Sequence, residues 1–229
     1  MVRLGVITGL AAEADILLEF PSERAPRVEI AGASGARAEA AATRLLAGGC
    51  EAILSFGVAG GLDPALAPGT VVIADSIVAA DGRRWPTDAR WRDAVRRALA
   101  GAVPLAAGAI AGSDAPLLTA AAKMDLAGRT GTVAVDMESH GVARAAALSG
   151  APFLAIRAVA DGASRAIPPW VMDAILPDGG LAPEKIARAL LPKPWQVWGL
   201  IGLARDNACA LGALRRVALR LGPGLGLAG

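Results

Sequence analysis

The sequence predicts an α/β protein of three layers, in which helices cover both faces of a central sheet that is largely parallel or mixed. Two observations lead to this prediction. Short apolar segments alternate with segments carrying helix signals over about the first 165 residues. The apolar segments run on without alternating polar residues, which is typical of strands buried on both faces of a sheet.

The elements follow one another in order. Residues 2–9 form an apolar strand that stops at Gly9, and an acidic helix over 11–20 comes next. A helix over 36–49 ends in two glycines, and the strand 51–62 ends in a glycine-rich turn. The same alternation then predicts strands at 69–80, 103–115, 131–137 and 151–163 and helices at 88–101, 116–128 and 138–150, the helix 116–128 with Pro116 in its first turn.

The chain of 229 residues is expected to hold one catalytic core and one extension. Residues 1–165 form the core. Residues 166–229 are rich in proline, tryptophan and arginine, and we expect two or three helices there, packed on the edge of the sheet as part of the same domain.

Composition excludes several classes of protein. A net charge of +2 gives no reason to expect a nucleic-acid partner. Cys50 and Cys209 lack a CxxC context and there is one histidine, so a Cys/His zinc site is excluded and two buried thiols in a reducing cytosol are expected. The sequence shows neither a signal peptide nor a run of about 18 apolar residues, so we expect a cytoplasmic protein.

Acids and glycines gather where the predicted strands end. In open α/β sheets, ligands bind at the carboxyl ends of the strands. The residues at these ends are Gly9, Gly57–Gly61, Asp114, Glu138 and Asp161, and we expect them to converge on one cleft.

Four collinear segments carry a resemblance to a known family. They are "GVITGLAAEADIL", "SFGVAGGLDPALAPGTVVIAD", "GAIAGSDAP" and "VDMES" followed by "APFLAIRAVADGA". Together they resemble the superfamily of purine nucleoside phosphorylases and 5′-methylthioadenosine/S-adenosylhomocysteine nucleosidases over residues 3–165. The resemblance implies the nucleoside phosphorylase-like fold, cleavage of an N-ribosidic bond, no cofactor and a homodimer or larger assembly.

The resemblance also implies roles for individual residues. Asp161 is the acid that protonates the departing purine at N7, which burial would favour by raising its pKa. Glu138 accepts hydrogen bonds from the ribose hydroxyls, with Met137 against the ribose face, and Glu13 activates the attacking water. The further residues expected against the substrate are Gly57, Val58, Asp114, Pro116, Leu117 and Arg157, of which Arg157 is expected to orient Asp161.

Each assignment has a structural alternative. Asp161 could cap a helix that follows its strand, Glu138 could be an acid favoured by a helix dipole, and Glu13 could belong to a surface helix. Asp136 is expected to support the site from behind, and His140 is expected to be structural.

The chain also departs from the family pattern. Phe56, Val58 and Ala160 replace a threonine and two serines, and Pro116 stands where an aromatic residue stacks on the base. The phosphorolytic branch holds phosphate at the glycine turn, where this chain has Ser55 and Val58. Water is therefore the expected nucleophile, with phosphate left open as a co-substrate.

The C-terminal segment narrows the choice of substrate. It resembles the tail of the hopanoid-associated branch, which releases adenine from adenosylhopane, and it would place a lipid on the 5′ carbon of the nucleoside. Apolar and basic side chains there could meet the lipid and the inner membrane: Ile167, Trp170, Val171, Met172, Ile175, Trp195, Trp198, Leu200 and Ile201, with Arg205, Arg215, Arg216 and Arg220. An ordinary core and dimer interface is the alternative for this tail.

Two other functions are also compatible with the sequence. One is a methylthioadenosine/S-adenosylhomocysteine nucleosidase, and another is a non-catalytic module that binds lipid or nucleotide. A Rossmann dehydrogenase is disfavoured, because "GVITGLAAE" lacks the G-x-G-x-x-G pattern.

Overall fold

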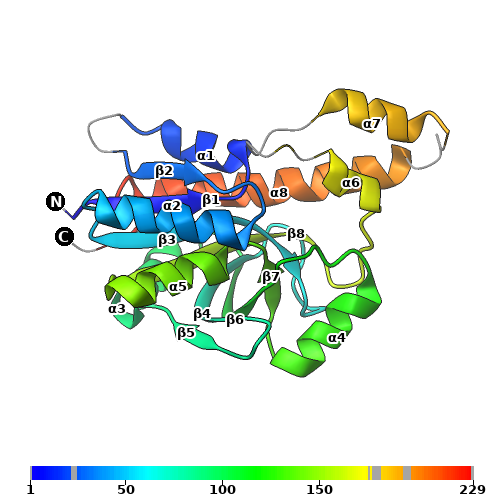
Figure 1. The fold of residues 1–229 in the computed structure, drawn as a ribbon. Coiled ribbons are helices and arrows are strands. Elements are labelled where there is room, and N and C mark those ends of the chain that lie inside the picture. Colours follow the sequence, from blue (N-terminus) through cyan, green and yellow to red (C-terminus); the bar gives the residue numbers. More distant parts are fainter. Residues whose placement is uncertain (1, 22–24, 175, 177–181, 193–196, 228–229) are drawn as a thin grey trace.

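A computed structural model describes residues 2–21, 25–174, 176, 182–192 and 197–227. The strands are β1 (Leu4–Thr8), β2 (Arg27–Ile30), β3 (Ala52–Gly61), β4 (Val71–Val78), β5 (Arg84–Pro86), β6 (Leu105–Gly112), β7 (Ala134–Asp136) and β8 (Phe153–Asp161). The helices are α1 (Ala11–Leu18), α2 (Gly35–Ala47), α3 (Ala89–Leu99), α4 (Ala120–Thr130), α5 (Ser139–Ser149), α6 (Pro169–Asp173), α7 (Pro183–Leu190) and α8 (Val197–Leu221). Strands and helices alternate over much of the chain, but β3, β4 and β5 are consecutive, and α6, α7 and α8 follow the last strand (Figure 1).

The described strands form one mixed sheet with the order β2-β1-β3-β7-β6-β4-β5. Strand β8 pairs in parallel with β3 and antiparallel with β4, so that β3, β8, β4, β6 and β7 close into a ring. The predicted α/β class, with a mixed central sheet and covering helices, is confirmed. The sheet is more closed than an open doubly wound sheet, which brings the ends of β3 and β8 side by side.

Two strands were not expected from the sequence, and one helix begins later than expected. Strands β2 and β5 are short and lie at the two ends of the strand order, with exposed or half-buried side chains, so they lack the apolar run of a central strand. Helix α4 begins at Ala120, where Thr119 caps it by accepting a hydrogen bond from Ala122 N at 3.1 Å. The prediction that Pro116 stands in the first turn of this helix is therefore wrong, and Pro116 lies in the preceding loop.

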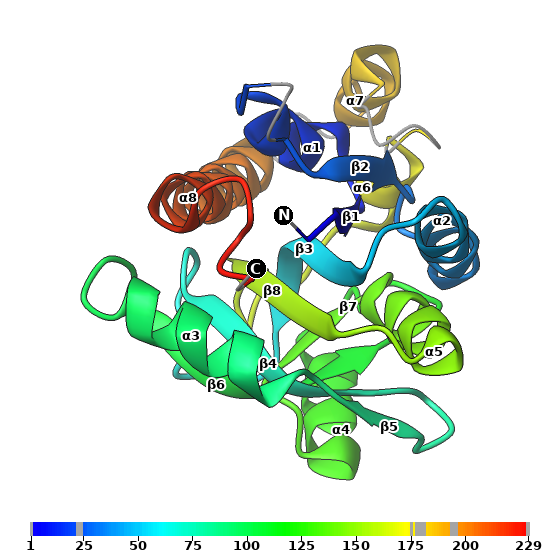
Figure 2. The same ribbon diagram turned by 90° about the vertical axis from the view of Figure 1, so that its left-hand side faces the viewer.

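Helices cover both faces of the sheet (Figure 2). Helices α1, α3 and α8 bury one face, and α2 and α5 bury the other with small side chains such as Ala42 and Ala145. Residues of α8 that are fully or almost fully buried include Ala210, Ala213, Leu214, Val217 and Ala218. The C-terminal helix therefore forms part of the core across a face of the sheet, and the expectation that it packs on the sheet edge is wrong.

Some of the residues expected to meet a lipid fall outside the part of the chain that the structure describes. Ile175 and Trp195 lie outside the described residues, and so do the side chains of Met172 and Trp198. The expected burial of both thiols is correct for Cys50 and wrong for Cys209, which is exposed on α8. None of the described helices is long and apolar enough to cross a membrane.

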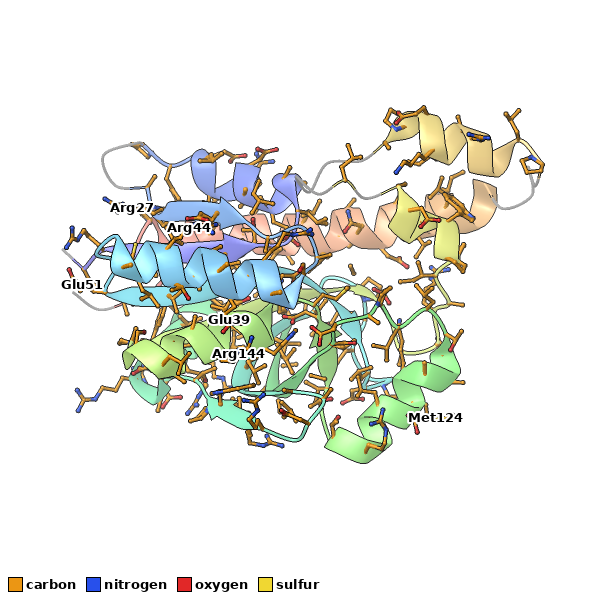
Figure 3. The ribbon with its side chains drawn as sticks, viewed as in Figure 1. Arg27, Glu39, Arg44, Glu51, Met124 and Arg144 are labelled. Atoms are coloured by element: carbon orange, nitrogen blue, oxygen red, sulfur yellow. The ribbon has the colours of Figure 1, made fainter. Side chains whose placement is uncertain are left out.

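Helices α2 and α5 approach each other closely, and this contact fixes the start of α5 relative to the sheet. A Cβ atom added to Gly141 would lie 2.0 Å from the carbonyl oxygen of Gly35, so the backbones touch where these glycines face each other. Farther along the two helices, Glu39 and Arg144 form an ion pair (Figure 3). The position of α5 matters because its first turn carries Glu138 and Ser139.

This packing gives a testable contrast between two helical glycines. We expect Gly141→Ala to lower the free energy of unfolding by about 1–3 kcal/mol, because the new methyl group meets backbone that cannot move away easily. Gly128→Ala in α4 is the matched control, since nothing lies within 4 Å of its added Cβ atom. It should raise the free energy of unfolding by about 0.5–1 kcal/mol through helix propensity alone. Urea denaturation of the three proteins measures both values, and equal effects would contradict the packing described.

Candidate active site

A buried guanidinium lies at the centre of the candidate site. Arg157 on β8 has 0% of its surface exposed, and its Nε atom lies 2.6 Å from Asp136 Oδ2. Its Nη2 atom lies 3.2 Å from Glu138 Oε2 and donates a hydrogen bond of 2.6 Å to Ser55 Oγ. A buried charge is tolerated only when it is paired in this way. Arg157 therefore holds the acid that ends β7 and the acid that follows it against the middle of β3.

Asp136 lies behind Glu138 and holds the first turn of α5. Its Oδ1 atom accepts hydrogen bonds from the backbone N–H groups of Ser139 at 2.9 Å and Glu138 at 3.3 Å, and so caps the first turn of α5. Its other oxygen accepts a hydrogen bond from Ser139 Oγ and faces Arg157. Because Asp136 takes the capping role, the carboxylate of Glu138 is free of it.

Glu13 is buried in the site, with 1% of its surface exposed, so the alternative of a surface helix is wrong. Its Oε2 atom accepts hydrogen bonds from the backbone N–H groups of Gly9 at 2.8 Å and Leu10 at 2.9 Å, and its Oε1 atom accepts one from Val58 at 2.8 Å. Burial raises the pKa of Glu13 above its ordinary value, while Arg157 and the three N–H donors act against that rise. A carboxyl group whose pKa is raised in this way is suited to act as a general base near neutral pH.

Glu138 occupies the position just before α5, but its side chain makes no capping hydrogen bond. A favourable interaction with the helix dipole alone therefore does not explain why an acid stands at this position. Burial raises the pKa of Glu138 to about 7, with Asp136 and Glu13 adding to the rise and Arg157 opposing it. Such a group can accept hydrogen bonds as a carboxylate or hold a proton near neutral pH.

Two glycines are required by the close approach of these acids. A Cβ atom at Gly57 would lie 2.6 Å from both oxygens of Glu13, and one at Gly9 would lie 2.7 Å from Glu138 Oε1. Any larger residue would displace a carboxylate. Glycine is therefore required after β1 and in β3 because a side chain at either position would collide with a carboxylate of the site.

Asp161 ends β8 and forms a buried ion pair with Lys123 of α4. Burial raises the pKa of Asp161, and Lys123 opposes this rise. The expectation that Arg157 orients Asp161 is wrong, because the described partners of Arg157 are Asp136, Glu138, Ser55, Ser139 and the carbonyl oxygen of Val58. The alternative of a helix cap is also wrong, because α6 begins only at Pro169.

Lys123 was not expected in the site from the sequence. The available signal was a lone lysine in the otherwise apolar stretch "AAAKM" of a short helix. A lysine in such a place is usually exposed, so the pattern alone does not identify it as a buried partner.

The segment Gly57–Gly61 of β3, called the glycine segment below, runs between the two groups of acids. Gly57 lies beside Glu13, and a Cβ atom at Gly60 would lie 3.4 Å from Asp161 Oδ2. Three residues of strand span about 10 Å, which is comparable to the length of a ribose joined to a purine. The segment is thus a backbone surface with acids at both ends.

The remaining predicted residues lie around this centre. Met137 is half-buried between the two acids of β7 and α5, and Val58 donates its N–H to Glu13. Asp114 is exposed and lies 3.0 Å from His140 Nε2, which agrees with a structural role for His140. Pro116 and Leu117 line a cavity of about 290 Å³ with residues of α4, but Glu13, Glu138 and Asp161 do not line it. The structure thus brings Glu13, Glu138 and Arg157 together and places Asp114, Pro116 and Leu117 outside that group.

Among the described residues, no group of three or more histidine, cysteine or acidic side chains is arranged to hold a metal ion. The acids around Arg157 are held by the guanidinium and by backbone N–H groups. Their chemistry is that of acids, bases and hydrogen-bond acceptors.

Comparisons with known proteins agree on the fold. The family model described as the phosphorylase superfamily matches residues 23–191. No curated protein matches the chain. Among solved structures, the chain is similar to the 5′-methylthioadenosine/S-adenosylhomocysteine nucleosidase of Neisseria meningitidis in complex with methylthio-immucillin-A, with a TM-score of 0.73 and 18% identity, over 96% of this chain and 99% of that one.

Two further structures extend this comparison. The Helicobacter pylori enzyme of the same name, with butyl-thio-DADMe-Immucillin-A, gives a TM-score of 0.70 and 17% identity over 94% of this chain and 97% of that one. The futalosine hydrolase of Helicobacter pylori gives 0.64 and 20% over 70% of this chain and 88% of that one. At these identities the likeness concerns the fold.

The central role of Arg157 can be tested by its removal. We expect Arg157→Met to lower the free energy of unfolding by about 3–5 kcal/mol, because it leaves buried carboxylates without their cation. Arg97→Met, on the exposed side of α3, is the control and should change it by less than about 0.5 kcal/mol. Equal stabilities of the two variants would contradict the network.

The raised pKa of Glu138 predicts a dependence of stability on pH. The folded protein holds the Glu138 proton up to about pH 7, whereas the ordinary pKa of a glutamate, as in the unfolded chain, is 4.5. The stability from this proton is complete below pH 4.5 and is lost as the pH rises to about 7. We therefore expect Glu138→Gln to gain stability relative to the wild type across this window. Denaturation from pH 4 to pH 8, with exposed Glu51→Gln as the control, measures the difference; a constant difference would refute the shift.

Proposed function

The chain belongs to the phosphorylase superfamily, and we propose that it cleaves the N-ribosidic bond of an adenine nucleoside and releases adenine. The observation that carries this proposal is the pair of acid groups at the two ends of the glycine segment. Glu13 and Glu138 lie at one end and Asp161 at the other, and burial raises the pKa of all three. Cleavage of this bond needs a proton donor for the base and acceptors beside the sugar.

Each acid has a distinct part in the proposed reaction. Glu13 takes a proton from water, whose oxygen attacks C1′ as the bond from C1′ to N9 breaks. The bonding electrons pass to the base, and Asp161 donates its proton to N7, so that neutral adenine leaves. Glu138 accepts hydrogen bonds from the ribose hydroxyls and stabilises the positive charge that develops on the sugar, with Met137 against the ribose face.

Water is the proposed nucleophile. A phosphate dianion would require free cations beside the glycine segment. Arg157 is already paired with Asp136 and Glu138, Ser55 is fully buried against it, and Val58 offers no charge. The carboxyl groups of Glu13 and Glu138 disfavour a second anion at this end of the segment.

Adenosylhopane is the proposed substrate, with a lipid on the 5′ carbon. Residues 162–168 lead from Asp161 to α6, and the neighbouring helices expose apolar side chains, with Leu191 81% and Ile201 53% exposed. Arg205 is exposed on the same helix as Ile201. These side chains support a surface for the hydrocarbon and a peripheral contact with the inner membrane. A homodimer or larger assembly is part of the same proposal.

A methylthioadenosine/S-adenosylhomocysteine nucleosidase is the second candidate. It is favoured by the similarity to the two nucleosidase structures over more than nine tenths of each chain. Its substrates carry a small 5′ substituent, so this candidate assigns no role to the exposed apolar side chains of Leu191, just after α7, and Ile201 in α8.

The proposal is tested by adenine release from adenosylhopane and, separately, from methylthioadenosine, each with and without phosphate. We expect release from adenosylhopane that does not depend on phosphate. Release from methylthioadenosine alone would favour the second candidate, and a requirement for phosphate would overturn the choice of water. Tight nucleoside binding without turnover would instead indicate a non-catalytic module.

The role of Asp161 has its own test. We expect Asp161→Asn to lower kcat by about 10²–10⁴-fold, because the amide cannot donate the acid proton. The exposed Asp125→Asn on α4 is the control and should retain activity. An Asp161→Asn protein with full activity would show that another group protonates the base.

A further inference from the structure

Helix α4 buries a charged side chain and little else. Of the residues in α4, Lys123 is the buried one, at 1% exposed, while its neighbour Met124 is 73% exposed on the outside of the helix (Figure 3). A helix that turns an ammonium group inward and a thioether outward reverses the usual preference. Burial of a lysine is unfavourable unless a specific partner compensates for it.

The partners of Lys123 account for all its hydrogen-bonding capacity. Its ammonium group pairs with Asp161 and donates hydrogen bonds to the carbonyl oxygens of Gly162 at 2.9 Å and Arg165 at 3.2 Å. An ammonium has three donors, and each is used here. All three acceptors lie at the end of β8 or in the loop after it, so Lys123 holds the carboxyl group of Asp161 and its surroundings in one arrangement.

We propose that Lys123 is a positioning residue, which fixes the carboxyl group of Asp161 towards the leaving base and stabilises the carboxylate that remains once the proton has been transferred. This inference rests on the proposed function, in which Asp161 is the acid. The proton passes from Asp161 to N7 of the base, and the carboxylate that remains is stabilised by the Lys123 ammonium beside it. Asp161 then regains a proton from solvent after adenine leaves, so Lys123 itself gains and loses none.

Among the charged groups near Asp161, Lys123 has the largest effect on the pKa of that carboxyl group. Burial raises the pKa of Asp161, and Lys123 is the largest influence that lowers it. Asp206 of α8 and Arg165 act in opposite directions, and they pair with each other at 2.7 Å. A buried carboxyl group without a cation would bind its proton too tightly to release it to the base.

The test compares Lys123→Met with Lys123→Arg, which keeps the positive charge, and with Lys185→Met as the control. Lys185 is exposed on α7, where it bonds to the carbonyl oxygen of Asp173. The first readout is the titration of Asp161, measured by NMR on protein labelled with ¹³C at the aspartate carboxyl groups. The Asp161 signal is assigned by its absence from the spectrum of Asp161→Asn. The second readout is kcat/KM for adenine release as a function of pH.

For Lys123→Met we expect the Asp161 titration and the alkaline limb of kcat/KM to move to higher pH. We also expect kcat/KM on the plateau to fall by about 10- to 100-fold, as misplacement of a catalytic group does. In Lys123→Arg, both the Asp161 titration and kcat/KM should return most of the way to their wild-type values. Lys185→Met should show neither change. Should Lys123→Met not fold, as judged by circular dichroism, Lys123→Gln takes its place.

The two proposals fail in different ways. An unmoved Asp161 titration in folded Lys123→Met overturns the inference, even if Asp161→Asn is inactive and the proposed function stands. Full activity of Asp161→Asn removes the acid role and with it the proposed chemistry, whatever the titration shows.

Discussion

The site depends on the ion pairs of one buried guanidinium. Arg157 comes from β8, and it binds Asp136 and Glu138 from the end of β7 and Ser55 from β3. Three strands therefore meet at one side chain that has no contact with water. The positions of α5 and of the Glu13 carboxylate follow from this, because Asp136 caps α5 and Gly57 leaves room for Glu13 beside Arg157. Without the guanidinium these acids could not share so small a buried volume.

The buried acids of the site have different electrostatic environments because they are paired with different basic side chains. Glu13, Asp136 and Glu138 share Arg157, and burial together with mutual repulsion raises the pKa of Glu138 to about 7. Asp161 instead has a lysine of its own, from α4. A guanidinium stays charged under all conditions, which suits a structural anchor, whereas a single ammonium beside a single carboxyl group suits the tuning of one acid. The glycine segment separates the two environments.

Much of this arrangement could be predicted from the sequence. Continuous apolar runs identified the central strands, and the family resemblance pointed to Glu13, Glu138 and Asp161 where those strands end. The partners of Arg157 and Asp161 could not be predicted. Lys123 and Asp161 are 38 residues apart and meet only because α4 folds back over the end of β8. The short strands β2 and β5 were missed because exposed edges carry no apolar run. Pairing across the fold depends on packing, which local patterns do not contain.

The central claim is that these acids direct water to C1′ of an adenine nucleoside. The most direct measurement is mass spectrometry of the sugar product formed in H₂¹⁸O with phosphate present. The account predicts free adenine and a sugar that carries ¹⁸O at C1′, with no sugar phosphate. The 1-phosphate of the 5-substituted ribose as the product would show that phosphate attacks instead. Absence of any cleaved product from adenosylhopane and methylthioadenosine would contradict the catalytic account as a whole.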